Sequence, residues 1–147
     1  MIELIEIKKA CNDILRAAFP GIKIYGPDTT GALKRPSFYT EIVPYTFSYE
    51  TVNRVSQSCG FKITLMEEVT NEDFELNCFA KIRKAFGLKL PIGKRKLTIS
   101  EVESEYIGAK NDIFQMTLRF EWYDSITEHQ EYDLMQDIAY NTKMKGN

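Results

Sequence analysis

Phe114-Gln115-Met116-Thr117-Leu118-Arg119-Phe120-Glu121-Trp122 is the most regular stretch of the chain, because every second residue in it is apolar. Successive side chains of a strand point to opposite faces, so the apolar side chains of this stretch share one face. The pattern predicts a strand over residues 112–124 with that face in a hydrophobic core.

Further strands are predicted upstream. Phe61, Ile63 and Leu65 alternate with polar residues, which is typical of a half-buried strand. Residues 36–44 predict a strand bracketed by prolines, which suit the ends and edges of strands because proline has no N–H to donate. Residues 45–60 are polar and form either a long hairpin arm or a mobile loop.

Two shorter regions complete the predicted sheet. Residues 22–25 alternate and predict a short strand, and a turn at residues 91–93 leads into a strand region over residues 97–107.

Two helices are predicted. Residues 2–18 form the first, which ends at Phe19-Pro20-Gly21; its apolar face holds Leu4, Ile7, Cys11, Ile14 and Ala18. The second covers residues 71–86, with Thr70 as its N-cap, Gly87 as its stop, and Phe74, Cys78, Ile82 and Ala85 or Phe86 on one face.

This order of elements predicts an α+β fold, in which two α-helices pack on one face of a mainly antiparallel β-sheet. We predict a domain over residues 1–125 and a C-terminal extension over residues 126–147. The extension is mostly polar and has too few apolar residues to fold alone, so we expect it to be disordered or ordered on a partner.

Composition limits the classes of function. The 147 residues suit one domain, and the net charge of -2, from 19 basic and 21 acidic residues, argues against a protein that mainly grips nucleic acid. The cysteines (Cys11, Cys59 and Cys78) are odd in number and have no CxxC spacing, so we expect reduced thiols in the cytoplasm. We find no secretory signal and no apolar run that would span a membrane.

No catalytic motif stands out, and we expect no cofactor and no metal. His129, the one histidine, lies in the polar extension, where a solvated side chain is the expected state. Lys94-Arg95-Lys96 predicts a solvated hairpin tip or, less simply, a phosphate contact. The aromatic residues Tyr39, Tyr45, Phe47 and Tyr49 have no basic groove beside them, so core packing or protein contact is expected rather than base stacking.

Glu101, Glu103 and Glu105 stand two residues apart and therefore project from one face of a strand. Three interpretations are open: a solvated face, a carboxylate site for acid–base work or a divalent metal, and a stripe of like charge that repels nucleic acid.

The chain resembles the tail terminator (tail completion) proteins of bacteriophages and prophages of Gram-positive bacteria. The resemblance covers residues 2–124. It rests on Ala18-Phe19-Pro20-Gly21, Ile24-Tyr25-Gly26, Lys34-Arg35-Pro36-Ser37-Phe38-Tyr39, Val43-Pro44 and a polar arm with Asn53-Arg54. The strand over residues 61–65, the helix over 71–86 and the final alternating strand complete it.

The resemblance implies a structural protein of the virion tail, assembled in the host cytoplasm, with no catalysis and no cofactor. It implies a six-membered ring of identical subunits on the last ring of the tail tube. Such a ring ends tail polymerisation and faces the head-side connector. Its partners would be further copies, the tail tube protein, the connector or neck protein and, in a contractile tail, the sheath, with no membrane contact. DNA would pass through the lumen without specific binding.

On this basis we predict that Glu101, Glu103 and Glu105 line the lumen and repel passing DNA. We predict Arg35, Arg54, Tyr39 and Tyr49 at the subunit interface, with both arginines in ion pairs. Two alternatives remain open at this point: another head–tail neck or connector component, and a metal-dependent hydrolase that uses the acidic strand.

Overall fold

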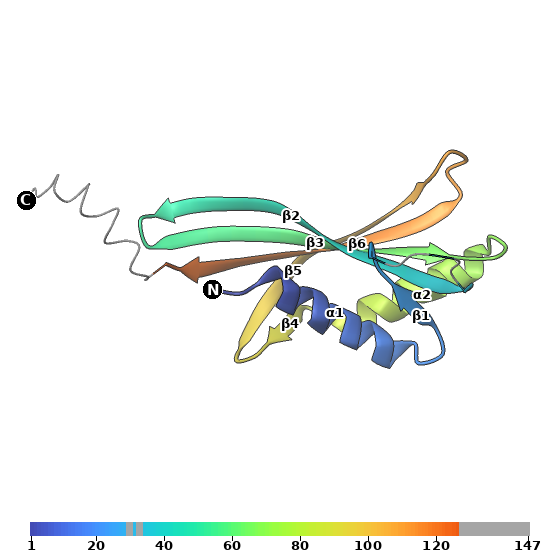
Figure 1. Cartoon of the computed structure of the whole chain (residues 1–147), viewed down its shortest axis with the longest axis horizontal. Coiled ribbons are helices and arrows are strands. Elements are labelled where there is room, and N and C mark those ends of the chain that lie inside the picture. The colour runs from blue at the N-terminus through green and yellow to red at the C-terminus, as the bar shows by residue number, and fades with distance from the viewer. Residues whose placement is uncertain (29–30, 32–33, 127–147) are drawn as a thin grey trace, which may run out of the picture.

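The computed structural model describes residues 1–28, 31 and 34–126. In this part of the chain two helices and six strands follow one another (Figure 1). In chain order they are α1 (Leu4–Ala18), β1 (Lys23–Tyr25), β2 (Ser37–Thr51), β3 (Arg54–Met66), α2 (Glu72–Phe86), β4 (Lys89–Ile92), β5 (Arg95–Ile107) and β6 (Ile113–Ser125).

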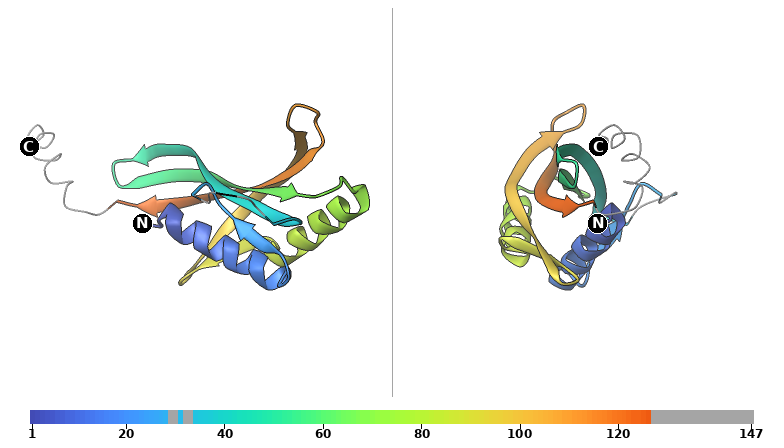
Figure 2. Two further views of the ribbon diagram at one scale, coloured as in Figure 1. Left: turned by 45° about the vertical axis from the view of Figure 1, so that its right-hand side comes forward. Right: turned by 90° about the vertical axis from the view of Figure 1, so that its left-hand side faces the viewer.

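All six strands belong to one sheet with the order β1-β2-β3-β6-β5-β4. Only the β1–β2 pair is parallel, and the other pairs are antiparallel. The sheet is strongly twisted and curls, and both helices lie on one side of it (Figure 2). The α+β class with a mainly antiparallel sheet and two helices on one face is confirmed.

The core lies between the helices and the sheet. The alternating stretch around Leu118 forms β6, and its five apolar side chains are buried as predicted. Phe61, Ile63 and Leu65 of β3 are buried beside them, since β3 and β6 are antiparallel neighbours. Burial of large side chains of this kind contributes about 1.5–3 kcal/mol each.

Each helix buries one stripe against the sheet. In α1 the fully buried residues are Ile7, Cys11 and Leu15, of which Leu15 was absent from the predicted face. In α2, Cys78, Ile82 and Phe86 are buried, and so is the charged Glu75.

The ends of α2 are set by local chemistry. The N-cap is Asn71, whose side chain accepts from the backbone N–H of Phe74, so the predicted cap Thr70 is wrong by one residue. At the other end Gly87 has a φ of 65°, a conformation that glycine adopts most easily, and the predicted stop is confirmed.

The polar region after Pro44 is a hairpin. β2 continues to Thr51 and β3 begins at Arg54, so the long-arm interpretation is correct and the mobile loop is not. β3 and β6 stay paired up to Arg54 opposite Ser125, so β6 runs alongside the β2–β3 hairpin to its end. We call the part of the β2–β3 hairpin formed by residues 45–58 the arm; it projects from one end of the molecule (Figure 1).

β4 was not predicted as a strand. It is short, contains Pro91, and lies at the edge of the sheet, where the missing N–H of proline is tolerated. The predicted extension over 126–147 falls outside the described residues except for Ile126, whose backbone N–H donates to the carbonyl oxygen of Asn53 at 2.8 Å.

Candidate functional site

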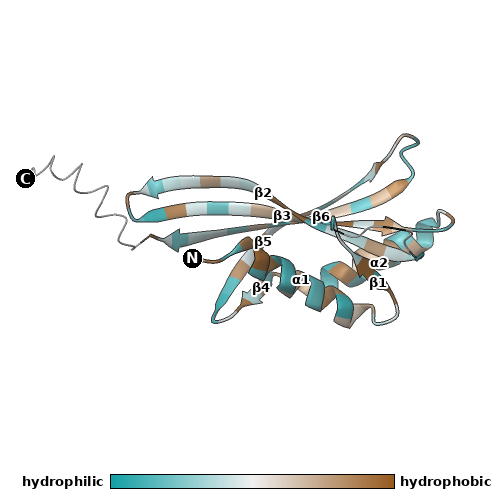
Figure 3. Cartoon of the chain, in the orientation of Figure 1, coloured by the Kyte–Doolittle hydropathy of each residue, from teal (hydrophilic) through white to brown (hydrophobic). Residues whose placement is uncertain are grey.

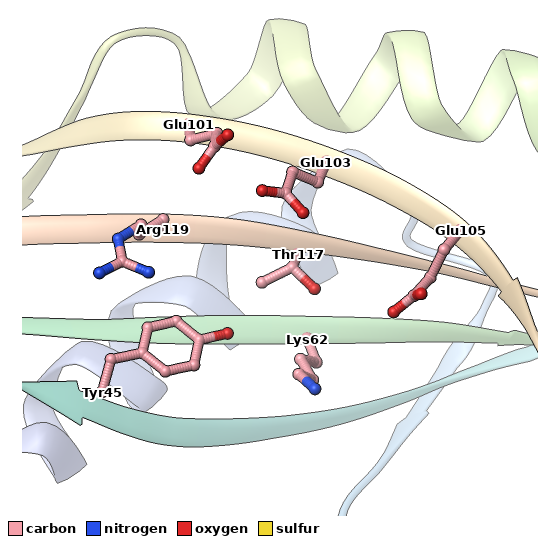
Figure 4. A pocket seen from close by; sticks show the side chains of 7 residues that line it. All are labelled: Tyr45, Lys62, Glu101, Glu103, Glu105, Thr117 and Arg119. Carbon is pink, nitrogen blue, oxygen red and sulfur yellow. The ribbon is translucent and has the colours of Figure 1, made fainter.

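The face of the sheet opposite the helices, here called the helix-free face, carries the three predicted lumen glutamates. Glu101, Glu103 and Glu105 are exposed and lie opposite Arg119, Thr117 and Gln115 of β6. They border a shallow hollow that is also lined by Tyr45 and Lys62 (Figure 4). The structure therefore brings the three carboxylates together on one face, as their spacing predicts.

Tyr45 forms one side of this hollow, in a position that the sequence did not reveal. β2 shifts its register between Pro44 and Thr46, so Tyr45 leaves the regular pairing. A Cβ atom on Gly60 would come within 2.7 Å of the Tyr45 ring, so the ring lies over the bare glycine backbone. The guanidinium carbon of Arg119 lies 4.7 Å from the ring centroid.

The charges of the hollow are unequal. Arg119 Nε lies 3.4 Å from Glu121 Oε2, so this arginine is already shared between a carboxylate and an aromatic ring. Glu101, Glu103 and Glu105 make no ion pair within the part of the chain that the structure describes. Three carboxylates face two cations, Lys62 and Arg119, in this hollow, so the stretch of β5 keeps a net negative charge.

Among residues 1–28, 31 and 34–126, no group of three or more histidine, cysteine, aspartate or glutamate side chains has a metal-binding arrangement. Carboxylates in a row along one exposed strand point in parallel, whereas cation sites need ligands that converge.

The four predicted interface residues fall into two groups. Arg35 and Tyr39 lie at the start of β2, where Arg35 Nη1 donates to the carbonyl oxygen of Glu67 at 3.1 Å. Tyr49 and Arg54 lie on the arm at the opposite end of β2 and β3. Tyr49 is 67% exposed, and Arg54 stacks on the ring of Tyr123 with its guanidinium carbon 4.2 Å from the centroid.

A buried carboxylate of β6 lies beside the outer part of the arm, where Asp124 pairs with Val55. Asp124 of β6 accepts from the Trp122 indole and the Gln57 amide at 2.9 Å, and from the backbone N–H of Ile2 at 3.2 Å. Arg95 donates to the same carboxylate and to the carbonyl oxygen of Tyr123. The predicted basic tip at Lys94-Arg95-Lys96 therefore contains one arginine with a structural role that sequence reasoning missed.

A second buried carboxylate lies in α2. Glu75 is fully buried, and its Oε1 accepts from the Tyr106 hydroxyl at 2.9 Å. Its Oε2 makes no hydrogen bond in the structure, and the Glu67 carboxyl lies close enough to Glu75 to donate a hydrogen bond to it when protonated. Burial and the hydrogen bond to Glu75 raise the pKa of Glu67 to about 7, because a proton on Glu67 supplies the donor that Glu75 lacks.

The three cysteines are buried thiols. Cys11, Cys59 and Cys78 are free and buried, and burial raises the pKa of each thiol, which keeps it protonated and unreactive. His129 lies outside the described residues. No described helix is long and apolar enough to cross a membrane.

Comparisons with known proteins bear on the fold and on the family. No curated protein matches the sequence. A chain from a structure titled as the virion of a native gene transfer agent particle is similar in fold. The TM-score is 0.51 at 17% identity over 80% of this chain and 93% of that one. Another solved structure, whose title names no function, gives a TM-score of 0.52 at 11% identity over 88% of this chain and 99% of that one.

The decisive comparison is with protein families. The family model described as "Phage tail terminator protein" matches residues 6–132, which includes every described strand and nearly all of α1. This range overlaps most of residues 2–124, over which the sequence resembles the same family. The match covers far more than half of the chain. The chain belongs to the phage tail terminator family and is a structural, non-enzymatic component of the virion tail.

Proposed function

We propose that six copies of this chain close into a ring on the last ring of the tail tube, and that the ring presents its other surface to the head-side connector. Family membership carries the role of capping the tube. A ring needs two unlike surfaces on each subunit, and the molecule offers an arm at one end and a different surface at the other. The implied host, a Gram-positive bacterium, is part of this proposal.

The lumen is the second part of the proposal. We infer that the helix-free face turns toward the hole, so that Glu101, Glu103 and Glu105 of each copy line it. Exposed carboxylates repel phosphates over a screening length of about 8 Å at physiological salt. The support is the negative stretch of β5, which has no compensating ion pairs among the described residues.

Tail length tests the capping role. Tails assembled without this chain should be overlong or lack a closing ring, and wild-type protein supplied in trans should restore uniform length. Electron microscopy of both preparations measures length and shows the tube ends. Tails of normal length and normal ends in its absence would refute termination.

Reversing the charge of Glu101, Glu103 and Glu105 tests whether these side chains line the lumen. The triple variants Glu101→Gln/Glu103→Gln/Glu105→Gln and Glu101→Lys/Glu103→Lys/Glu105→Lys should both give rings and tails of normal length. DNA ejection should slow in the lysine variant more than in the glutamine variant, because added cations bind phosphates. Equal ejection rates in all three proteins would place the stripe away from the DNA.

The partner separates this role from that of another neck component. A tail terminator binds purified tail tubes, whereas a head-closure protein binds the portal side of the head. Binding of the purified chain to heads but not to tubes would favour the neck alternative.

A further inference from the structure

The two ends of strand β3 carry complementary surfaces. β3 has 13 residues, from Arg54 to Met66. At about 3.3 Å per residue its ends lie about 40 Å apart. The β2–β3 turn lies at one end of the molecule, and the connection from β3 to α2 lies at the other (Figure 1).

The arm end is aromatic, with one cation. Phe47 and Tyr49 are 50% and 67% exposed and meet edge to face, with their ring centroids 5.4 Å apart. Val52 in the turn is 63% exposed and adds an apolar tip, which Figure 3 shows at the β2–β3 turn. Arg54 stands next to this tip on the other face of the hairpin, where it stacks on Tyr123, and it makes no ion pair with any described residue.

The opposite end has a shallow apolar hollow with an acidic rim, here called the end hollow. Pro36, Val69 and Phe74 supply its apolar surface, and Glu67, Glu68 and Asn71 complete its lining. Val69 is 80% exposed. Glu68 is exposed and has no ion-pair partner in the described part of the chain.

We propose that the arm of one copy docks into the end hollow of the next copy. In this contact Phe47 and Tyr49 pack on Val69 and Phe74, and Arg54 pairs with Glu68 of the neighbour. The proposal rests on the ring proposed above and names the contact that closes it.

Three properties favour a second copy as the occupant. The two surfaces are unlike and lie at opposite ends of one strand, which is what a head-to-tail contact in a closed ring requires. Their charges are opposite, and opposite charges across an interface fix its register and speed association. Aromatic and arginine side chains are also the types that contribute most binding energy to protein interfaces.

A charge-swap mixture tests the contact. R54E sets two carboxylates against each other across the contact, and E68R sets two guanidinium groups against each other, so neither variant alone should form rings on tail tubes. An equimolar mixture should form rings when the two variants alternate, because every contact then joins either two wild-type surfaces or two exchanged charges of opposite sign. A six-membered ring allows this alternation. The readout is the fraction of tubes with a closing ring in electron micrographs.

Matched variants separate assembly from folding. R16E reverses an exposed charge on α1 and should form rings as the wild type does. V69D places a carboxylate in the end hollow and should abolish rings without a change in thermal unfolding, because this side chain is already in water. Thermal unfolding of R54E and E68R verifies that both chains are folded before they are mixed.

The outcomes distinguish the two proposals. Absence of wild-type rings would overturn the ring and this contact with it. Wild-type rings together with normal rings from R54E, E68R or V69D would overturn the contact alone. A mixture that fails to restore rings would also overturn the Arg54–Glu68 pairing. Rings that form in the mixture and in neither variant alone would support the contact.

Discussion

Asp124 is the residue on which the outer part of the arm depends. Its side chain is 2% exposed and joins β6 to β3, to Arg95 and to the backbone of Ile2. A buried carboxylate is tolerated only when donors surround it, and here four different groups donate to it. One sign of this role is visible in the sequence, since an aspartate replaces the apolar residue due at the next core position of β6.

Asp124→Ala should lower the free energy of unfolding by about 3 kcal/mol, because it leaves the Arg95 guanidinium and the Trp122 and Gln57 donors without their acceptor. Urea unfolding followed by tryptophan fluorescence measures the loss. Glu121→Ala on the exposed face of the same strand is the matched control and should change little. A similar small loss for both variants would show that the buried network contributes nothing.

Glu67 makes the stability of the fold depend on pH. Folding raises the pKa of its carboxyl from 4.5 to about 7, through burial and the hydrogen bond to Glu75. Tyr106, Glu72 and Cys78 also face this pair, and the backbone N–H of Asn71 donates to Glu67. Between these two pKa values the folded chain holds a proton that the unfolded chain has lost. The Glu67 contribution to stability therefore falls as pH rises from 4.5 to about 7, and is constant above that.

Glu67→Gln should remove this fall, because its amide donates to Glu75 at every pH while its oxygen still accepts from Asn71. The stability of the variant should match that of the wild type at about pH 5 and exceed it at about pH 8. Thermal unfolding midpoints of both proteins across this range provide the measurement. Parallel curves for the two proteins would contradict the shared proton.

At the scale of elements, the arm shows the limit of sequence reasoning most clearly. The alternation around Leu118 predicts β6 because one side of that strand is buried. In the outer half of β2, Tyr45, Phe47 and Tyr49 alternate with polar residues, but both faces are exposed, so this alternation does not mark a buried side of a strand. Its extended state comes from pairing with β3, a contact between chain segments that a local pattern does not contain. β4 escaped prediction for a similar reason, since four residues with a proline are too few to show a period.

Some features of the candidate surfaces could likewise be predicted from the sequence, and others could not. The spacing of Glu101, Glu103 and Glu105 predicts their shared face, because a strand has a fixed period. The position of Tyr45 over Gly60 follows from a register shift in β2, and the end hollow joins residues from separate segments. Neither feature has a sequence signal of its own.

The double variant Phe47→Ser/Tyr49→Ser tests the arm as an element. Both rings are largely in water, so the midpoint of thermal unfolding should change by only a few degrees. Ring formation on tail tubes should be lost, because an aromatic anchor of the proposed contact is gone. Tyr25→Phe, away from the arm, serves as the comparison and should assemble normally. Normal ring formation by the serine variant would exclude the arm from the interface.

For the whole molecule, the central claim is that one small domain ends the growth of a tube by shape alone. The curled sheet has helices on one face only, and the three regions that we propose for assembly are the helix-free face, the arm and the end hollow. The family match assigns the tube as the structure that is capped. Addition of the purified chain to polymerising tail tube protein tests this claim most directly, with tube length measured by electron microscopy. Growth should stop at the capped end, which should carry one added ring, and mean length should fall as more chain is added. Tubes that keep growing at the same rate, with bare ends at every concentration, would contradict it.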